Sequence, residues 1–354
     1  MSRERIGGLQ VLRAILALMV AAGHSFLIFN VPTQPSSLDT AASLYALVVL
    51  QAGNAVMIFY VLSGFVLSAY FRGIGMADVN GYLSFIVRRL IRLWPVAAAS
   101  VLLGIGYVVL VPNHRLDIAG VWFNASLFPQ PLGSASLVLN FLIYDWDFNG
   151  VLWSIWIEIT VAFIMPFLVY AKDHLGPVPR LILGVALAAI MVFTESPLVT
   201  KFLFCFYLGL HVHHAISWIS GRHAILAVVA LMAAQGLLLH QMMDQSKVAL
   251  VAALSGFVVV AYHAKQKVAY SRLLEWLGEL SYSFYAVHLI VMHATAMLLL
   301  NSIFTLTGST FIAQAMIAAV SIAIAVAAAI PVYILVEKPS IRLATNVGAM
   351  LRRN

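Results

Sequence analysis

The 354-residue chain has little charge and almost no cysteine. Charged residues make up 9% of it, whereas about a quarter is usual for a soluble domain. Cys205 is the single cysteine, so no disulfide can form within the chain and cysteine usage says nothing of the redox compartment. Hydrophobic residues instead make up 63% of the chain, and the mean hydropathy is +0.99. The chain is therefore expected in a lipid bilayer.

The N-terminal region lacks a strong cleavage site for a signal peptide. Arg13 interrupts the first apolar run, and residues 20–22 offer only a weak small-residue candidate. We therefore expect an uncleaved first span. The sequence also lacks repeats, low-complexity tracts and linkers, which predicts one integral-membrane domain over residues 1–354, with spans over about 8–337 and no separate soluble domain.

Apolar runs predict an all-α membrane bundle of about ten transmembrane helices. They are expected near residues 8–30, 44–71, 88–111, 150–171, 181–195, 198–216, 223–241, 247–264, 276–300 and 311–337. Only residues 195–197 divide the fifth from the sixth, so nine to eleven helices fit. With a cytoplasmic N-terminus, sixteen of the 20 Lys and Arg residues fall inside and three outside, which predicts cytoplasmic termini. Because basic residues set topology in this way, the net charge of +7 requires no nucleic-acid partner.

Two ionisable residues lie within the first apolar segment, over residues 9–29. Arg13 and His24 are eleven residues apart, which brings them to nearly the same helix face at about 16 Å along the axis. A charge at membrane depth costs on the order of 2.5 kcal/mol or more, and such groups normally face a cavity. We expect the two side chains to line one cavity. The alternative is that His24 is a structural histidine bonded to a neighbouring hydroxyl.

Arginines gather where the second apolar segment ends and the third begins. Arg88 and Arg92 are four apart and share a helix face, with Arg89 alongside, while Arg72 ends the preceding segment. One interpretation is topology with contact to anionic lipid headgroups. The other is a site for phosphates, which guanidinium groups bind well.

Two later segments place polar groups on one helix face. Ser154 and Glu158 are four apart, and a carboxylate at membrane depth must be paired, protonated or hydrated. The Glu158 carboxylate can orient an imidazole, balance the charge of Arg13 or form a hydrogen bond to another helix. Ser281, Tyr285 and His288 form a second polar stripe, which a packing network also explains.

Three further patterns carry structural expectations. Trp153, beside Ser154, is typical of an interfacial anchor. His211, His213 and His214 lack a partnering acid and a metal-binding spacing, so no metal site is expected. Pro339 is expected to stop the last helix, with Glu337 pairing with a cytoplasmic arginine.

These motifs together resemble the acyltransferase-3 family of integral-membrane enzymes, which O-acylate glycans and other hydroxyl acceptors. The resemblance covers nearly the entire chain, and its motifs occur in the family's order. They are Arg13 and His24 with ten residues between them, the run over 56–67 with Ser63-Gly64, Arg88-Arg89-x-x-Arg92-x-x-Pro95, Leu152-Trp153-Ser154 with Glu158, Leu277 to His288, and 336–339. Ile157 is a mild departure from the family pattern.

The resemblance implies transfer of an acyl group, expected to be acetyl, from coenzyme A to a hydroxyl of a glycan such as exopolysaccharide or O-antigen. It implies catalytic roles for His24 as general base and Glu158 as orienting group. Arg13 would meet the donor, and Arg72, Arg88, Arg89 and Arg92 would hold its phosphates. Trp153, Ser154, Tyr285 and His288 would support the site.

Acyl-CoA is then a substrate, no cofactor is permanently bound, and the expected location is a bacterial inner membrane. A covalent acyl-histidine relay is a variant of this mechanism. The alternative from another class is a transporter or flippase of a lipid-linked glycan, which performs no acyl transfer. The fold of the membrane-bound O-acyltransferases and an inactive scaffold are two further alternatives.

Overall fold

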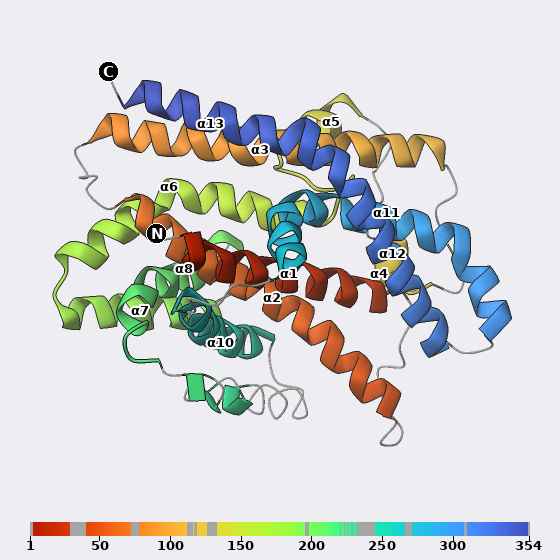
Figure 1. The fold of residues 1–354 in the computed structure, drawn as a ribbon, viewed down its shortest axis with the longest axis horizontal. Coiled ribbons are helices and arrows are strands. Elements are labelled where there is room, and N and C mark those ends of the chain that lie inside the picture. Colours follow the sequence, from red (N-terminus) through yellow and green to blue (C-terminus); the bar gives the residue numbers. More distant parts are fainter. Residues whose placement is uncertain are drawn as a thin grey trace.

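The fold is a bundle of helices, shown in Figure 1. The computed structural model describes residues 3–28, 40–71, 78–111, 116, 119–125, 133–194, 198–219, 221–222, 224, 226–227, 229–231, 245–265, 271–307 and 310–352. Within these ranges every regular element is a helix, which confirms the predicted all-α class.

The helices have the following bounds, in chain order: α1 (Arg3–Phe26), α2 (Thr40–Tyr70), α3 (Val79–Leu110), α4 (Val121–Ala125), α5 (Ser134–Phe141), α6 (Leu152–His174), α7 (Pro177–Phe193), α8 (Leu198–Ala215), α10 (Gln245–Lys265), α11 (Arg272–Thr307), α12 (Thr310–Val332), the π-helix η1 (Tyr333–Glu337) and α13 (Lys338–Leu351).

Seven helical stretches in the described ranges are long and apolar enough to cross a membrane, so this is a multi-pass membrane protein. They are Gly7–Ser25, Ala52–Tyr70, Val79–Leu110, Leu152–His174, Ser246–Lys265, Arg272–Thr307 and Ala315–Leu351. The predicted fifth and sixth spans form separate helices, α7 and α8. The expected span at 223–241 lies largely outside the described residues, so the count of ten stays a prediction. In Figure 1, α1 begins and α13 ends towards the same end of the bundle.

The third helix begins nine residues earlier than expected. Asp78 caps α3, because its carboxylate accepts a hydrogen bond from the backbone N–H of Gly81 at 2.7 Å. The helix therefore starts at Val79 instead of at residue 88. As a result, Arg88 and Arg89 lie about three turns into the helix, where their side chains reach neighbouring helices.

The C-terminal segment does not end at Pro339, contrary to the sequence prediction. The π-helix η1 leads directly into α13, and Pro339 lies in the first turn of α13, where its missing N–H leaves no helical hydrogen bond unmade. Glu337 is buried and accepts hydrogen bonds from the Ser283 backbone N–H at 3.1 Å and hydroxyl at 2.5 Å. No arginine among the described residues forms an ion pair with it.

Glycines bring two pairs of helices into backbone contact. A Cβ at Gly278 of α11 would collide with the backbone of Gln10, which fixes α11 against the parallel helix α1. Gly64 of α2 packs in the same way on the backbone of Phe206 in α8. Figure 1 draws α1 near the centre of the bundle, where it contacts α2, α10, α11 and α12.

Candidate functional site

A cavity of about 420 Å³ lies between α1, α2, α3, α6 and α11. Its charged lining residues are Arg13, Arg89, Arg92 and Glu158. Apolar side chains, including Phe59 of α2, form much of the remaining wall. The sequence motifs therefore come together from five helices, with more cationic than anionic groups around the space.

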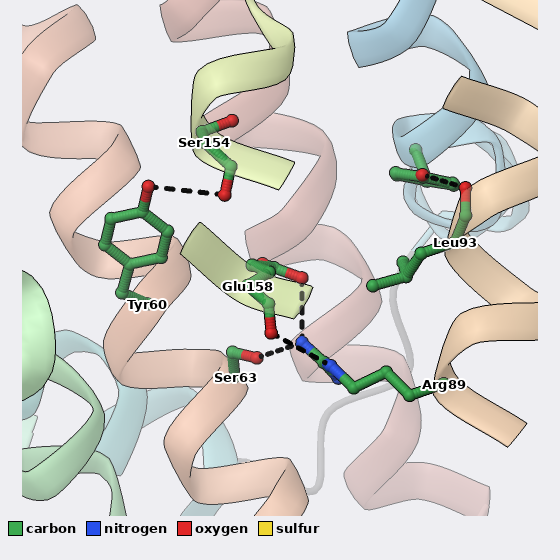
Figure 2. Close-up of polar contacts among 7 residues, drawn as sticks. Tyr60, Ser63, Arg89, Leu93, Ser154 and Glu158 are labelled. Atoms are coloured by element: carbon green, nitrogen blue, oxygen red, sulfur yellow. Dashed lines mark hydrogen bonds and ion pairs between the residues drawn. The ribbon is translucent and has the colours of Figure 1, made fainter. Parts of the chain in front are cut away.

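Arg89 and Glu158 form an ion pair across the side of this cavity. The Arg89 guanidinium lies 2.9 Å from the Glu158 carboxylate and donates to the Ser63 hydroxyl at 3.1 Å (Figure 2). The two charged side chains are only 13% and 20% exposed. Glu158 therefore finds its counter-ion in Arg89 and not in Arg13 or an imidazole.

Arg13 and Arg92 also line the cavity, and neither forms an ion pair with any carboxylate that the structure describes. Arg13 donates through Nε to the Ser281 hydroxyl at 3.2 Å. Arg92 is exposed, so its guanidinium marks the place where the cavity meets the protein surface. Two guanidinium groups are thus available to an anionic ligand.

Gln10 lies one helical turn before Arg13 and lines the same cavity. Its Oε1 atom is buried and has no hydrogen-bond donor among the described residues. A buried amide oxygen without a partner costs free energy, and a ligand N–H would satisfy it. Sequence reasoning missed this residue, although its spacing of three from Arg13 places both on one helix face.

Arg88 points away from the cavity. Its guanidinium carbon lies 5.4 Å from the centre of the Tyr70 ring, and its side chain packs against Gly348 of α13. It therefore belongs to the α3–α13 contact and not to the cavity lining. Arg72, the other expected phosphate ligand, lies outside the described residues.

His24 pairs with His288 instead of lining the cavity. Its Nδ1 atom lies 2.9 Å from Nε2 of His288, and its ring stacks on Trp122 at 5.3 Å between ring centres. The expectation that Arg13 and His24 open onto one cavity is therefore not met. Along α1 the lining ends at Arg13, and His24 lies about three turns further on.

Polar groups connect the inner end of the cavity to this histidine pair. The Tyr285 hydroxyl, which lines the cavity, lies 2.7 Å from the Ser154 hydroxyl. The backbone carbonyl of Tyr285 lies 2.7 Å from Nδ1 of His288. Tyr60, which sequence reasoning missed, donates its hydroxyl to the Ser154 carbonyl at 3.5 Å (Figure 2). One residue, Tyr285, thus touches both the cavity and the histidine pair.

Trp153, another expected residue, lies elsewhere in the bundle. Trp153 packs its ring against Phe202 of α8, 5.9 Å between centres, and does not line the cavity. Trp122, which contacts His24, belongs to none of the sequence motifs, so no sequence signal indicated it. Over the described ranges, no three His, Cys, Asp or Glu side chains come together as a metal site requires.

Comparison with protein families gives a match over most of the chain. The model of a family described as an acyltransferase domain matches residues 6–334. No match was found among curated proteins or among solved structures.

Proposed function

We propose a function for this chain from the premise that it belongs to the acyltransferase-3 family. The proposed reaction moves the acyl group of acyl-CoA, with acetyl the expected group, to a hydroxyl of a glycan such as exopolysaccharide or O-antigen. The observation that carries the donor assignment is the cavity with two arginines that form no ion pair with a described carboxylate. The proposed location is the inner membrane of a bacterium.

The cavity suits the thioester arm of acyl-CoA. Its volume of about 420 Å³ lies low in the range of small-molecule sites, so it would hold the arm and leave the nucleotide part outside. Arg92, exposed at the surface, would meet phosphates, and Arg13 lies deeper. The arm contains amide N–H groups, one of which would satisfy Gln10 Oε1.

His24 would act as general base in the transfer. An imidazole suits this role because it gains and loses a proton near neutral pH. The base takes the proton of the acceptor hydroxyl, and the hydroxyl oxygen attacks the thioester carbonyl carbon. The carbon–sulfur bond then breaks, and the departing thiolate takes a proton from the imidazolium, which regenerates the base.

The remaining residues would shape the route between the cavity and His24. Tyr285 and Ser154 lie at the inner end of the cavity, before His24 is reached. Transfer requires the thioester to pass their hydrogen bond. The Arg89–Glu158 pair would hold α3 and α6 around the donor, which is a positioning role for Glu158.

One observation favours the second candidate, a transporter or flippase of a lipid-linked glycan. His24 does not line the cationic cavity, so the cavity by itself is a binding site without a base. A transporter would bind an anionic ligand there and cleave no thioester.

Thiol release separates the two candidates. Purified protein in nanodiscs is given acetyl-CoA, with and without a hydroxyl acceptor, and free thiol is followed by a colour reagent. An acyltransferase releases thiol in proportion to the acceptor acylated, and a strain lacking the protein loses acetyl groups from its surface glycans by mass spectrometry. A transporter releases no thiol with any acceptor.

A further inference from the structure

We propose that His288 is a positioning residue that fixes the tautomer of His24, so that Nε2 of His24 is the basic nitrogen. The inference rests on the proposed function, because it concerns the same base.

The hydrogen bonds fix the protons one after another. The Tyr285 carbonyl oxygen can only accept a hydrogen bond, so Nδ1 of His288, 2.7 Å away, carries a proton. A neutral imidazole has one N–H, which leaves Nε2 of His288 as an acceptor. Nδ1 of His24 lies 2.9 Å from that acceptor and must donate to it. Nε2 of His24 therefore holds the lone pair.

The surroundings of His288 favour its neutral form. The residue is 1% exposed, and no carboxylate in the described ranges forms an ion pair with it. An unpaired buried charge is costly, and a second cation beside His24 would add repulsion. The proton positions assigned above, which assume neutral rings, therefore hold for His288 and His24.

The ring geometry suits a directional hydrogen bond. The planes of His24 and His288 differ by only 4° and the ring centres lie 5.2 Å apart, so the 2.9 Å contact between Nδ1 and Nε2 runs close to the plane of both rings. Trp122 stacks on His24, and Phe284 stacks on His288 at 5.8 Å between centres. These aromatic contacts hinder rotation of either ring out of the shared plane.

In this arrangement His288 orients the catalytic histidine, which is the role of the aspartate in a serine–histidine–aspartate triad. When Nε2 of His24 takes the proton of the substrate hydroxyl, the Nδ1–H of His24 stays hydrogen-bonded to His288. The lone pair on His288 then stabilises the imidazolium without bringing a negative charge into the bilayer. Because the contact acts on the base and not on the donor, its loss should lower kcat and leave the donor KM unchanged.

Two variants test the inference in full-length protein. His288→Leu removes the acceptor, and His288→Gln keeps an oxygen that can accept from His24. We expect His288→Leu to lower kcat by about 10²-fold to 10⁴-fold and to leave the acetyl-CoA KM within twofold of wild type. The kcat of His288→Gln should be higher than that of His288→Leu by about tenfold or more. Wild-type kcat in His288→Leu, or an equal loss in both folded variants, would overturn the inference.

A second measurement does not depend on activity or on the stability of a variant. In wild-type protein with ¹⁵N-labelled histidine, the His24 signals are identified by their absence in His24→Gln. The inference predicts the Nδ1–H tautomer for His24, and an Nε2–H tautomer would overturn it. If wild-type protein releases no thiol, the proposed function fails, while the tautomer still decides the structural inference.

Discussion

The Arg89 guanidinium lies 2.9 Å from the Glu158 carboxylate and ties α3 to α6 beside the cavity. Both side chains are largely shielded from solvent, so each leaves a poorly solvated charge behind when its partner is removed.

Breaking the pair should destabilise the protein. Glu158→Gln and Arg89→Gln should each lower the free energy of unfolding by about 3 kcal/mol, the low end for a buried pair. The double variant should lose clearly less than the sum of the two, because it leaves no unpaired charge. Denaturant unfolding in mixed micelles measures all three. Additive losses would show that the two groups do not interact.

Arg92 and Arg88 form a matched pair for testing the donor site, since they are one turn apart on α3 and only Arg92 lines the cavity. Arg92→Gln should raise the KM for acetyl-CoA about tenfold, which corresponds to one lost charged hydrogen bond. Arg88→Gln should leave that KM unchanged, because Arg88 faces Tyr70 and α13. Steady-state thiol release gives both values, and an equal effect of the two substitutions would contradict the cavity assignment.

Gln10 should recognise an amide of the donor. Gln10→Leu should raise the KM for acetyl-CoA about fivefold, the value of one neutral hydrogen bond. The KM for acetyl thiophenol, a thioester without amide groups, should stay the same. If the KM rises equally for both donors, the substitution acts through packing and not through the buried oxygen of Gln10.

The approach of α11 to α1 should depend on the absence of a side chain at position 278. Gly278→Ala should lower the thermal unfolding midpoint, because its Cβ would collide with the Gln10 backbone. Gly106→Ala is the control, since a Cβ there meets no atom within 4 Å and alanine favours a helix. Equal midpoints for the two variants would mean that α1 and α11 separate without cost.

The sequence predicted the fold class because span length and hydropathy are local properties. Motifs on α1, α3, α6 and α11 each contribute residues to one cavity, although His24, Arg88 and Trp153 do not line it. Helix ends were less predictable. The Asp78 cap moved the start of α3, and η1 carried the chain past Pro339, because both depend on backbone hydrogen bonds that hydropathy does not encode.

Pairings within the site could not be read from spacing. Arg88 and Arg89 are neighbours in sequence but point to different helices, which becomes visible only once α13 is placed. Arg13 and His24 both bond to α11, as side chains on one face of α1 can. They do not line one cavity, because a cavity also depends on where the side chains of α6 and α11 fill the space.

The most direct test of the account is thiol release and acceptor acylation by wild-type protein and His24→Gln, both purified in nanodiscs. The account predicts acceptor-dependent thiol release by the wild type and a loss of at least 10²-fold in His24→Gln, with an unchanged unfolding midpoint and unchanged acetyl-CoA binding. Full acylation of the acceptor by folded His24→Gln would contradict the account, because the transfer would then proceed without the proposed base.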